Sequence, residues 1–294
     1  MAMSGAASHA ASGEGEYHFG TGNALVDAAS DDDDVPRVHR LLEAGADPNG
    51  SDRHGFTALI YAAGSPPIDD DGSPRESGEN AEIARLLIDA RADVNVDVFE
   101  RHVRGRSCCL ESAVREGNHP VARLLVDAGA DLDQRDYHGY SPLLTASLHC
   151  DQVSVRMLTD GGADVNLLTP CGDAPLHIVA KHNKCPVVLR MLLDAGADIE
   201  AEDANGFTPL LAAVDQGFAD GVRVLIDAGA DVHAAVDGFT PLKIARDLRN
   251  NLNLMNRTPA EAQRARDDMI TMLRNAIVVW PRASGSRRIH ATSS

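Results

Sequence analysis

A 33-residue unit that recurs along the chain constrains its fold more than any other feature. The clearest copy is Glu202 to Ala234, EDANGFTPLLAAVDQGFADGVRVLIDAGADVHA. Thr208 followed by Pro209 is typical of a helix start, because the hydroxyl caps the helix and proline is tolerated in its first turn. Gly217 separates this helix from a second apolar segment, and Gly229 suits the left-handed position that ends many helices. The unit therefore predicts a hairpin followed by two short helices.

The other copies are located by the leucine after Thr-Pro and by the glycine before Ala-Asp. These pairs are Leu25/Gly45, Leu59/Arg91, Leu110/Gly129, Leu143/Gly162, Leu176/Gly196 and Leu210/Gly229, and a seventh copy starts at Leu242. From Gly129 onward the glycines fall 33, 34 and 33 residues apart. Neither helix of one copy could bury its apolar side alone. We therefore expect the copies to stack into one elongated solenoid with a continuous core.

The repeated text resembles the ankyrin repeat, which that family writes as DxxGxTPLHxAA, a glycine turn and VxxLLxxGADVN. Here the regular copies read DYHGYSPL, TPCGDAPLHIVA and DANGFTPLLAA. The resemblance implies an all-α fold, an ankyrin-repeat α-solenoid of about six to seven helix-turn-helix repeats with β-hairpin fingers. We expect a disordered N-terminal segment at residues 1–21, the ankyrin repeat domain at residues 22–276 and a C-terminal tail at residues 277–294.

Insertions near residues 64–80, 98–106 and 246–261 interrupt the regular copies. The first, GSPPIDDDGSPRESGEN, is expected to be a surface loop, since such loops lengthen at small thermodynamic cost. Arg91 replaces the closing glycine, and a non-glycine residue in the left-handed region loses ~1 kcal/mol, so we expect a distorted helix end there. A helix in Arg264 to Ala276 is expected to cap the array, with Trp280 folding back on it.

Composition narrows the class of partner. The formal charge of −17 argues against nucleic-acid binding, because phosphates would be repelled, and favours a protein partner with a neutral or basic surface. The five cysteines are odd in number and scattered, no apolar signal segment opens the chain, and no run of about 18 apolar residues could span a membrane. We therefore expect a reduced, intracellular monomer, cytoplasmic or also nuclear, that does not enter a membrane.

Side chains that vary inside this repetitive frame are candidates for partner binding, because packing does not fix them. One column, immediately after the hairpin glycine, holds Phe56, Tyr140, Phe207 and Phe239, with Asp173 as the exception. Rows of aromatic side chains make binding hot spots, but these rings could equally lean on the next hairpin. By resemblance, partners bind the fingertips and the concave face of the first helices. The residues at these places are Arg53, His54, Phe56, Phe99, Arg101, Arg104, Tyr137, His138, Tyr140, Asn205, Phe207 and Phe239.

Catalytic and metal-binding patterns are weak. Cys108 and Cys109 are adjacent, and adjacent thiols cannot easily supply tetrahedral zinc together. Side chains of neighbouring repeats could converge, but buried inert thiols are far commoner. These side chains are Cys150, Cys171, Cys185, His149, His177 and His182. There is no phosphate-cradling loop and no nucleophile elbow. We expect no enzyme, no catalytic residue, no metal and no cofactor, and the resemblance implies that His177 stabilises backbone turns.

The function that follows is a non-catalytic protein-protein interaction scaffold. One alternative is a substrate-recruiting or inhibitory subunit, or an effector, of a regulatory complex. An alternative of another class is a metal-dependent or thiol-based enzyme in the third to fifth repeats. The resemblance further implies possible hydroxylation at the asparagine of GADVN, which here is Asn49, Asn95 and Asn166.

Overall fold

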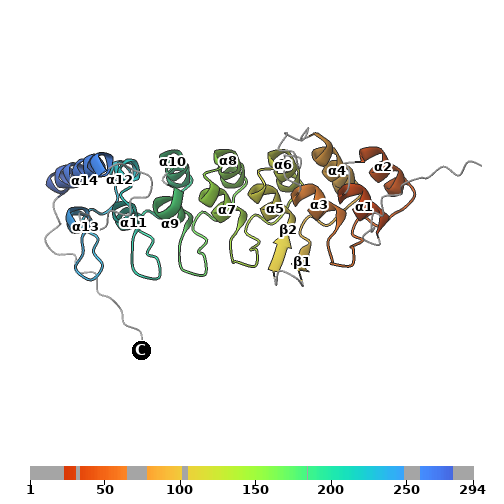
Figure 1. The fold of residues 1–294 in the computed structure, drawn as a ribbon, viewed down its shortest axis with the longest axis horizontal. Coiled ribbons are helices and arrows are strands. Elements are labelled where there is room, and N and C mark those ends of the chain that lie inside the picture. The colour runs from red at the N-terminus through yellow and green to blue at the C-terminus, as the bar shows by residue number, and fades with distance from the viewer. Residues whose placement is uncertain are drawn as a thin grey trace, which may run out of the picture.

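The chain folds into an elongated stack of helix pairs with hairpins projecting along one side (Figure 1). The computed structural model describes residues 23–30, 34–64, 78–100, 105–183, 185–247 and 259–280. Seven helix pairs follow one another within these residues. The segment at residues 1–21 and most of the insertions at 64–80 and 246–261 lie outside them.

The first helices of the pairs form one row, beside the hairpins, and the second helices form a parallel row (Figure 1). The first row consists of α1 (Ala24–Ser30), α3 (Ala58–Gly64), α5 (Cys109–Arg115), α7 (Pro142–His149), α9 (Pro175–Ile178), α11 (Pro209–Asp215) and α13 (Pro241–Asp247). The second row consists of α2 (Val35–Glu43), α4 (Gly78–Asp89), α6 (His119–Asp127), α8 (Gln152–Asp160), α10 (Pro186–Asp194), α12 (Ala219–Asp227) and α14 (Pro259–Val279). A π-helical turn, η1 (Val179–Asn183), continues α9. The all-α solenoid that the repeat predicts is confirmed.

One hydrophobic core runs through the stack, because each helix packs on its partner and on the helices before and after it in its row. The repeat leucine of each of the first six pairs is at most 2% exposed. These residues are Leu25, Leu59, Leu110, Leu143, Leu176 and Leu210. Alanines such as Ala62, Ala63 and Ala213 are fully buried beside them. The small side chains let neighbouring helices approach closely, so leucine and alanine fill the core.

Local sequence sets where the helices begin. Thr208 Oγ1 accepts a hydrogen bond from the Leu211 N–H, 3.4 Å away, and Pro209 takes the first position of α11. Ser141 caps α7 in the same way. In the second row, Asp34 Oδ1 accepts from the Arg37 N–H at the start of α2. The Thr-Pro signal of the repeat therefore marks a helix start in the structure as in the sequence.

The second-row helices from α2 to α12 close with a residue in the left-handed conformation. The closing glycines have φ between 83° and 93°, and they are Gly45, Gly129, Gly162, Gly196 and Gly229. Arg91 closes α4 with φ 68°. Its N–H donates to the Ile88 carbonyl and the Ala92 N–H donates to the Leu87 carbonyl, the same pair of bonds that closes the glycine-ended helices. The expected distortion at Arg91 is wrong, because the strain falls on one backbone conformation and leaves the helix end regular.

The hairpins are the fingers that the repeat predicts. The insertion near residues 98–106 forms a regular two-stranded antiparallel sheet of β1 (Asp97–Glu100) and β2 (Gly105–Cys108), with Asp97 opposite Cys108. Other fingers are tighter turns. Single bridges join Ser51 to Thr57 and Val236 to Phe239 in two of them.

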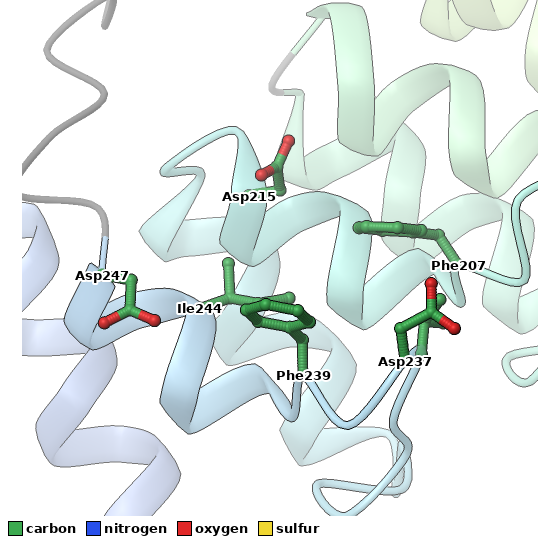
Figure 2. Close-up of a pocket in the computed structure, with 7 residues that line it drawn as sticks. Phe207, Asp215, Asp237, Phe239, Ile244 and Asp247 are labelled. Atoms are coloured by element: carbon green, nitrogen blue, oxygen red, sulfur yellow. The ribbon is translucent and has the colours of Figure 1, made fainter.

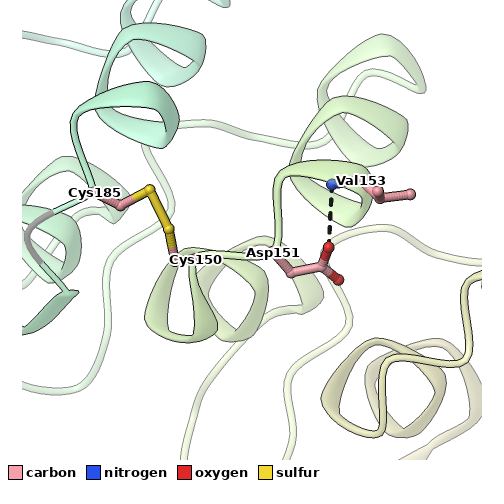
Figure 3. Close-up of a disulfide and its surroundings, with 4 residues drawn as sticks. All are labelled: Cys150, Asp151, Val153 and Cys185. Atoms are coloured by element: carbon pink, nitrogen blue, oxygen red, sulfur yellow. Dashed lines mark hydrogen bonds between the residues drawn. A yellow bond between two sulfur atoms is a disulfide. The ribbon is translucent and has the colours of Figure 1, made fainter. Parts of the chain in front are cut away.

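A disulfide joins Cys150 to Cys185, whose Cα atoms are 6.2 Å apart (Figure 3). Cys150 ends α7 and Cys185 precedes α10, so the bond links the inter-helix turns of two neighbouring repeats. The expectation of a fully reduced chain is wrong for this pair, because stacking brings together two turns that are 35 residues apart in sequence. Cys108 and Cys109 are buried and Cys171 is exposed, and these three do not belong to the disulfide.

The last helix, α14, has 21 residues and is longer than the expected Arg264 to Ala276. It packs on α12 and α13 through buried Met269, Leu273 and Ala276. The helix continues three residues past Ala276, to Val279. His233 Nε2 lies 2.9 Å from the Trp280 carbonyl oxygen, which ties the end of α14 to the preceding repeat.

Candidate protein-interaction surface

The fingers place several predicted binding side chains at the surface. Arg53, Tyr137, His138, Asn205 and Phe239 are exposed. The remaining described members are half-buried, and they are His54, Phe56, Tyr140 and Phe207. The backbone of Phe99 lies in β1, and Arg101 and Arg104 lie outside the described residues.

A buried aspartate at the base of three fingers fixes each turn. Asp203 Oδ1 accepts hydrogen bonds of 2.8 Å from the N–H groups of Asn205 and Phe207. Asp52 Oδ1 accepts in the same way from the second and fourth residues after it, and Asp136 Oδ1 accepts from the Tyr140 N–H. The three aspartates are at most 8% exposed. Each turn is therefore ordered before any partner arrives, while its tip residues are free to differ.

Neighbouring fingers also pack on one another. A Cβ atom on Gly139 would lie 2.5 Å from Pro170 Cγ of the next finger, and one on Gly172 would lie 2.8 Å from the Ala204 backbone nitrogen. Both glycines have φ 81°. Glycine is required there both for the turn and for the close approach. The fourth, fifth and sixth fingers therefore pack side by side.

Asp173, which takes the place of an aromatic residue in the column that follows the hairpin glycine, has a structural role. Lys181 Nζ lies 2.5 Å from Asp173 Oδ1 and 2.6 Å from Asp203 Oδ2. Against the effect of burial, these hydrogen bonds raise the pKa of Lys181. Burial alone would raise the pKa of Asp203. The hydrogen bonds from Lys181 and from backbone N–H groups outweigh burial and lower this pKa. Asp173 thus joins the fifth finger to the sixth through a lysine.

Two rings of the column, Phe56 and Phe239, contact groups of their own repeats. The ring centroids of Phe56 and Tyr61 are 5.6 Å apart, and Lys243 Nζ lies 4.1 Å from the centroid of Phe239. Burial raises the pKa of Tyr140, and Asp173, Cys171 and Asp136 add to the rise. The surroundings of Tyr140 in the fourth finger are therefore acidic.

His177 stabilises two turns, as the resemblance implies. It is fully buried, and its Nδ1 accepts from the Ala174 N–H at 3.2 Å. Nε2 then carries the proton and donates to the Phe207 carbonyl of the next finger at 2.9 Å. Burial lowers the pKa of His177, so the neutral ring is favoured.

Sequence reasoning missed Glu111, a buried carboxylate on α5. Its Oε2 lies 2.8 Å from Arg115 Nη1, and the Thr145 hydroxyl donates to Oε1 at 3.4 Å. Burial raises the pKa of Glu111 to about 7, and Asp136 adds to the rise against the opposing effect of Arg115. The available signal was a glutamate at a position where the sixth repeat has a leucine, Leu211.

The structure assigns the asparagines of GADVN a role that the sequence did not predict. Five side chains form an inter-repeat ladder, each accepting a bond of 2.6–2.9 Å from a backbone N–H of the next repeat. The five are Asn49, Asn95, Asp133, Asn166 and Glu200. In each bond the donor lies two residues beyond the closing residue of the next second-row helix, as Asp131 does beyond Gly129. The ladder holds consecutive repeats in register.

The described residues offer little for catalysis or metal binding. Burial raises the pKa of Cys109 to about 12, so this thiol stays protonated and is a poor nucleophile. No group of three or more His, Cys, Asp or Glu residues is placed to hold a metal ion in the described ranges. None of the helices described there combines the length and the apolar character needed to cross a bilayer.

The finger, the two helices and their stacking define the class of protein. A family model that describes three consecutive ankyrin repeats matches this chain over residues 75–169, 146–236 and 176–254. The chain belongs to the ankyrin repeat family. Ankyrin repeats generally mediate protein-protein interaction, and domains built from them are typically non-catalytic.

Individual relatives agree with this assignment. The chain is 32% identical over 187 residues to the mouse (Mus musculus) B-cell lymphoma 3 protein homolog, covering 63% of this chain and 38% of that protein. The solved ankyrin repeat domain of Bcl-3, described as a unique member of the IkappaB protein family, superposes with a TM-score of 0.64. It is 23% identical and covers 86% of this chain and 98% of the solved chain, so this likeness shows the fold alone.

An ankyrin repeat domain from Acinetobacter baumannii superposes with a TM-score of 0.60 at 26% identity. That match covers 70% of this chain and 98% of the other.

Proposed function

We propose that the chain is a non-catalytic scaffold that binds a protein partner through its fingertips and the concave face of the first-row helices. The observation that carries the proposal is the contrast within each finger. Asp52, Asp136 and Asp203 hold the turns in place, while exposed tip residues such as Arg53, Tyr137 and Asn205 differ from one repeat to the next. A preordered surface loses little conformational entropy on binding, so varied tips can be used for specificity.

The charge supports a partner with a neutral or basic surface. The chain carries a formal charge of −17, and Asp173 and Asp136 add to the rise in the pKa of Tyr140 that burial causes in the fourth finger. An acidic surface attracts basic partners over long range and raises their association rate. We further propose that the scaffold acts as a monomer inside the cell, in the cytoplasm or the nucleus, and binds neither nucleic acid nor membrane.

A capture experiment with two triple variants tests this function. Arg53→Ala, Tyr137→Ala and Asn205→Ala change three exposed tips on three fingers. Arg123→Ala, Arg156→Ala and Arg190→Ala, on α6, α8 and α10, are the matched control. We expect proteins captured from a cell lysate by the wild type to be lost from the tip variant and kept by the control. Equal capture by all three proteins would contradict binding through the fingertips.

Two other roles stay predictions. One is that the array is a substrate-recruiting or inhibitory subunit of a regulatory complex, which differs from the scaffold in what the partner does after binding. The other is hydroxylation of Asn49, Asn95 and Asn166. These three side chains are exposed and belong to the inter-repeat ladder.

A further inference from the structure

A hollow of about 290 Å³ lies between the sixth and seventh repeats (Figure 2). Four apolar side chains line it, and they are Phe207, Val236, Phe239 and Ile244. Three carboxylates complete the lining, Asp215 at the end of α11, Asp247 at the end of α13 and Asp237 in the seventh finger. The hollow therefore combines two aromatic rings with three acidic groups.

The same helix position carries a cation in other repeats. Five residues after the repeat leucine, the third repeat has Arg115 and the fifth has Lys181. Arg115 pairs with Glu111, and Lys181 pairs with Asp173 and with Asp203 of the next finger. The sixth and seventh repeats have Asp215 and Asp247 at this position. At this position the fifth repeat carries a cation, whereas the sixth and seventh repeats carry anions.

These acids have no basic partner within the described part of the chain. No lysine or arginine there forms an ion pair with Asp215, Asp237 or Asp247. Asp215 accepts only a neutral bond in these ranges, from the Gln216 amide at 3.0 Å. Lys243 instead lies over the ring of Phe239, 4.1 Å from its centroid. This contact shows that the ring face already attracts a cation.

We propose that this hollow binds an arginine side chain presented by the protein partner. The inference rests on the proposed function and adds the chemistry of the partner at one site. A guanidinium group is planar, so it stacks on an aromatic ring and donates hydrogen bonds in its own plane to carboxylates. Lysine offers a single point charge and cannot do both equally well. The rings of Phe207 and Phe239 with the three acids therefore favour arginine.

Titration of the full chain with small amides tests the inference without knowledge of the partner. The probes are the amides of N-acetyl-arginine, Nα-acetyl-lysine and N-acetyl-citrulline, and the readout is the backbone amide NMR shifts of Phe207, Phe239 and Ile244. We expect saturable shifts with the arginine amide, weaker binding of the lysine amide and none of the citrulline amide. Citrulline keeps the shape of arginine without its charge. No saturable shift with arginine, or equal binding of citrulline, would overturn the inference.

Charge-neutral variants separate electrostatics from shape. Asp215→Asn with Asp247→Asn should weaken arginine binding about tenfold or more, since a hydrogen bond between two charged groups is stronger than one to a neutral amide. Asp160→Asn with Asp194→Asn, on α8 and α10, makes the same change of net charge in the second row and should leave binding unchanged. Equal weakening by both pairs would contradict a local site.

Lys243→Gln gives an independent readout that does not depend on the stability of the aspartate variants. Because Lys243 covers the Phe239 ring, its removal should strengthen arginine binding severalfold by removing a competing cation. Unchanged or weaker binding by this variant would count against the site. If the arginine amide does not bind while fingertip-dependent capture is intact, this inference alone is wrong. If the arginine amide binds but capture does not depend on the fingertips, the proposed binding through the fingertips is wrong.

Discussion

Lys181, in the π-helical turn after α9, donates to Asp203 of the next finger, with Nζ and Oδ2 2.6 Å apart. Asp203 in turn holds the sixth turn through the N–H groups of Asn205 and Phe207. A single lysine thus connects the helix of one repeat to the finger of the next. The geometry of the sixth fingertip therefore depends on a charge that lies behind it.

Lys181→Met should lower the free energy of unfolding by about 1–3 kcal/mol, because it leaves Asp173 and Asp203 without their cation. The loss is smaller than the ~3–5 kcal/mol typical of a fully buried pair, since the lysine side chain is 22% exposed. Urea denaturation measures the effect, with Lys243→Met on an exposed residue as the control. A loss no larger than that of the control would show that the pair contributes little.

Arg91→Gly should raise the free energy of unfolding by ~1 kcal/mol, because glycine adopts the left-handed conformation without the penalty of a side chain. Arg85→Gly, in the interior of α4, should instead lower it by ~1 kcal/mol. The two variants make the same chemical change six residues apart. Opposite signs in chemical denaturation would confirm that backbone conformation, not the lost arginine, determines the result.

Glu111 should make stability fall as pH rises. Its folded pKa is about 7 against an ordinary value of 4.5, so the folded state holds this proton more tightly than the unfolded state. The stabilising contribution is complete below about pH 4.5 and is lost as pH rises to about 7. Glu111→Gln should therefore gain stability relative to the wild type over this range, by up to ~3 kcal/mol. Parallel stability curves for the two proteins would show that this carboxylate does not titrate in the fold.

Reduction of the Cys150–Cys185 disulfide should lower the free energy of unfolding by about 2–4 kcal/mol, because the bond restricts a long loop of the unfolded chain. Cys150→Ser with Cys185→Ser should reproduce the loss and make stability independent of reductant. Cys171→Ser, at an exposed free thiol, is the control and should keep the dependence. If the wild type has the same denaturation midpoint with and without reductant, the bond does not form in solution.

Hydroxylation of the GADVN asparagines should appear as added oxygen in the intact mass of protein isolated from cells. Peptide mapping should place the oxygen on Asn49, Asn95 or Asn166. Asp133 and Glu200 stand at equivalent places in the inter-repeat ladder and lack the amide, so their peptides are internal controls. An unmodified intact mass would leave these asparagines with a structural role only.

Much of the fold follows from local patterns. Thr208 and Pro209 start α11, Gly229 follows the end of α12, and the spacing of the copies is sufficient to predict stacking. The fingertip candidates that the structure describes also lie on projecting turns, because the packed helices fill the space between repeats and the hairpin must extend outward. Their use by a partner stays a proposal.

The sequence by itself determined the unit and its repetition, because caps, closing residues and apolar spacing act within about thirty residues. Only the tertiary structure decided which side chains of different repeats meet. Stacking set the Cys150–Cys185 bond, the contact of Lys181 with Asp203 and the inter-repeat ladder, none of which a single copy contains. It also gathered Asp215 and Asp247 around one hollow. The physical reason is that these contacts depend on the separation of neighbouring repeats, which packing fixes across the whole array.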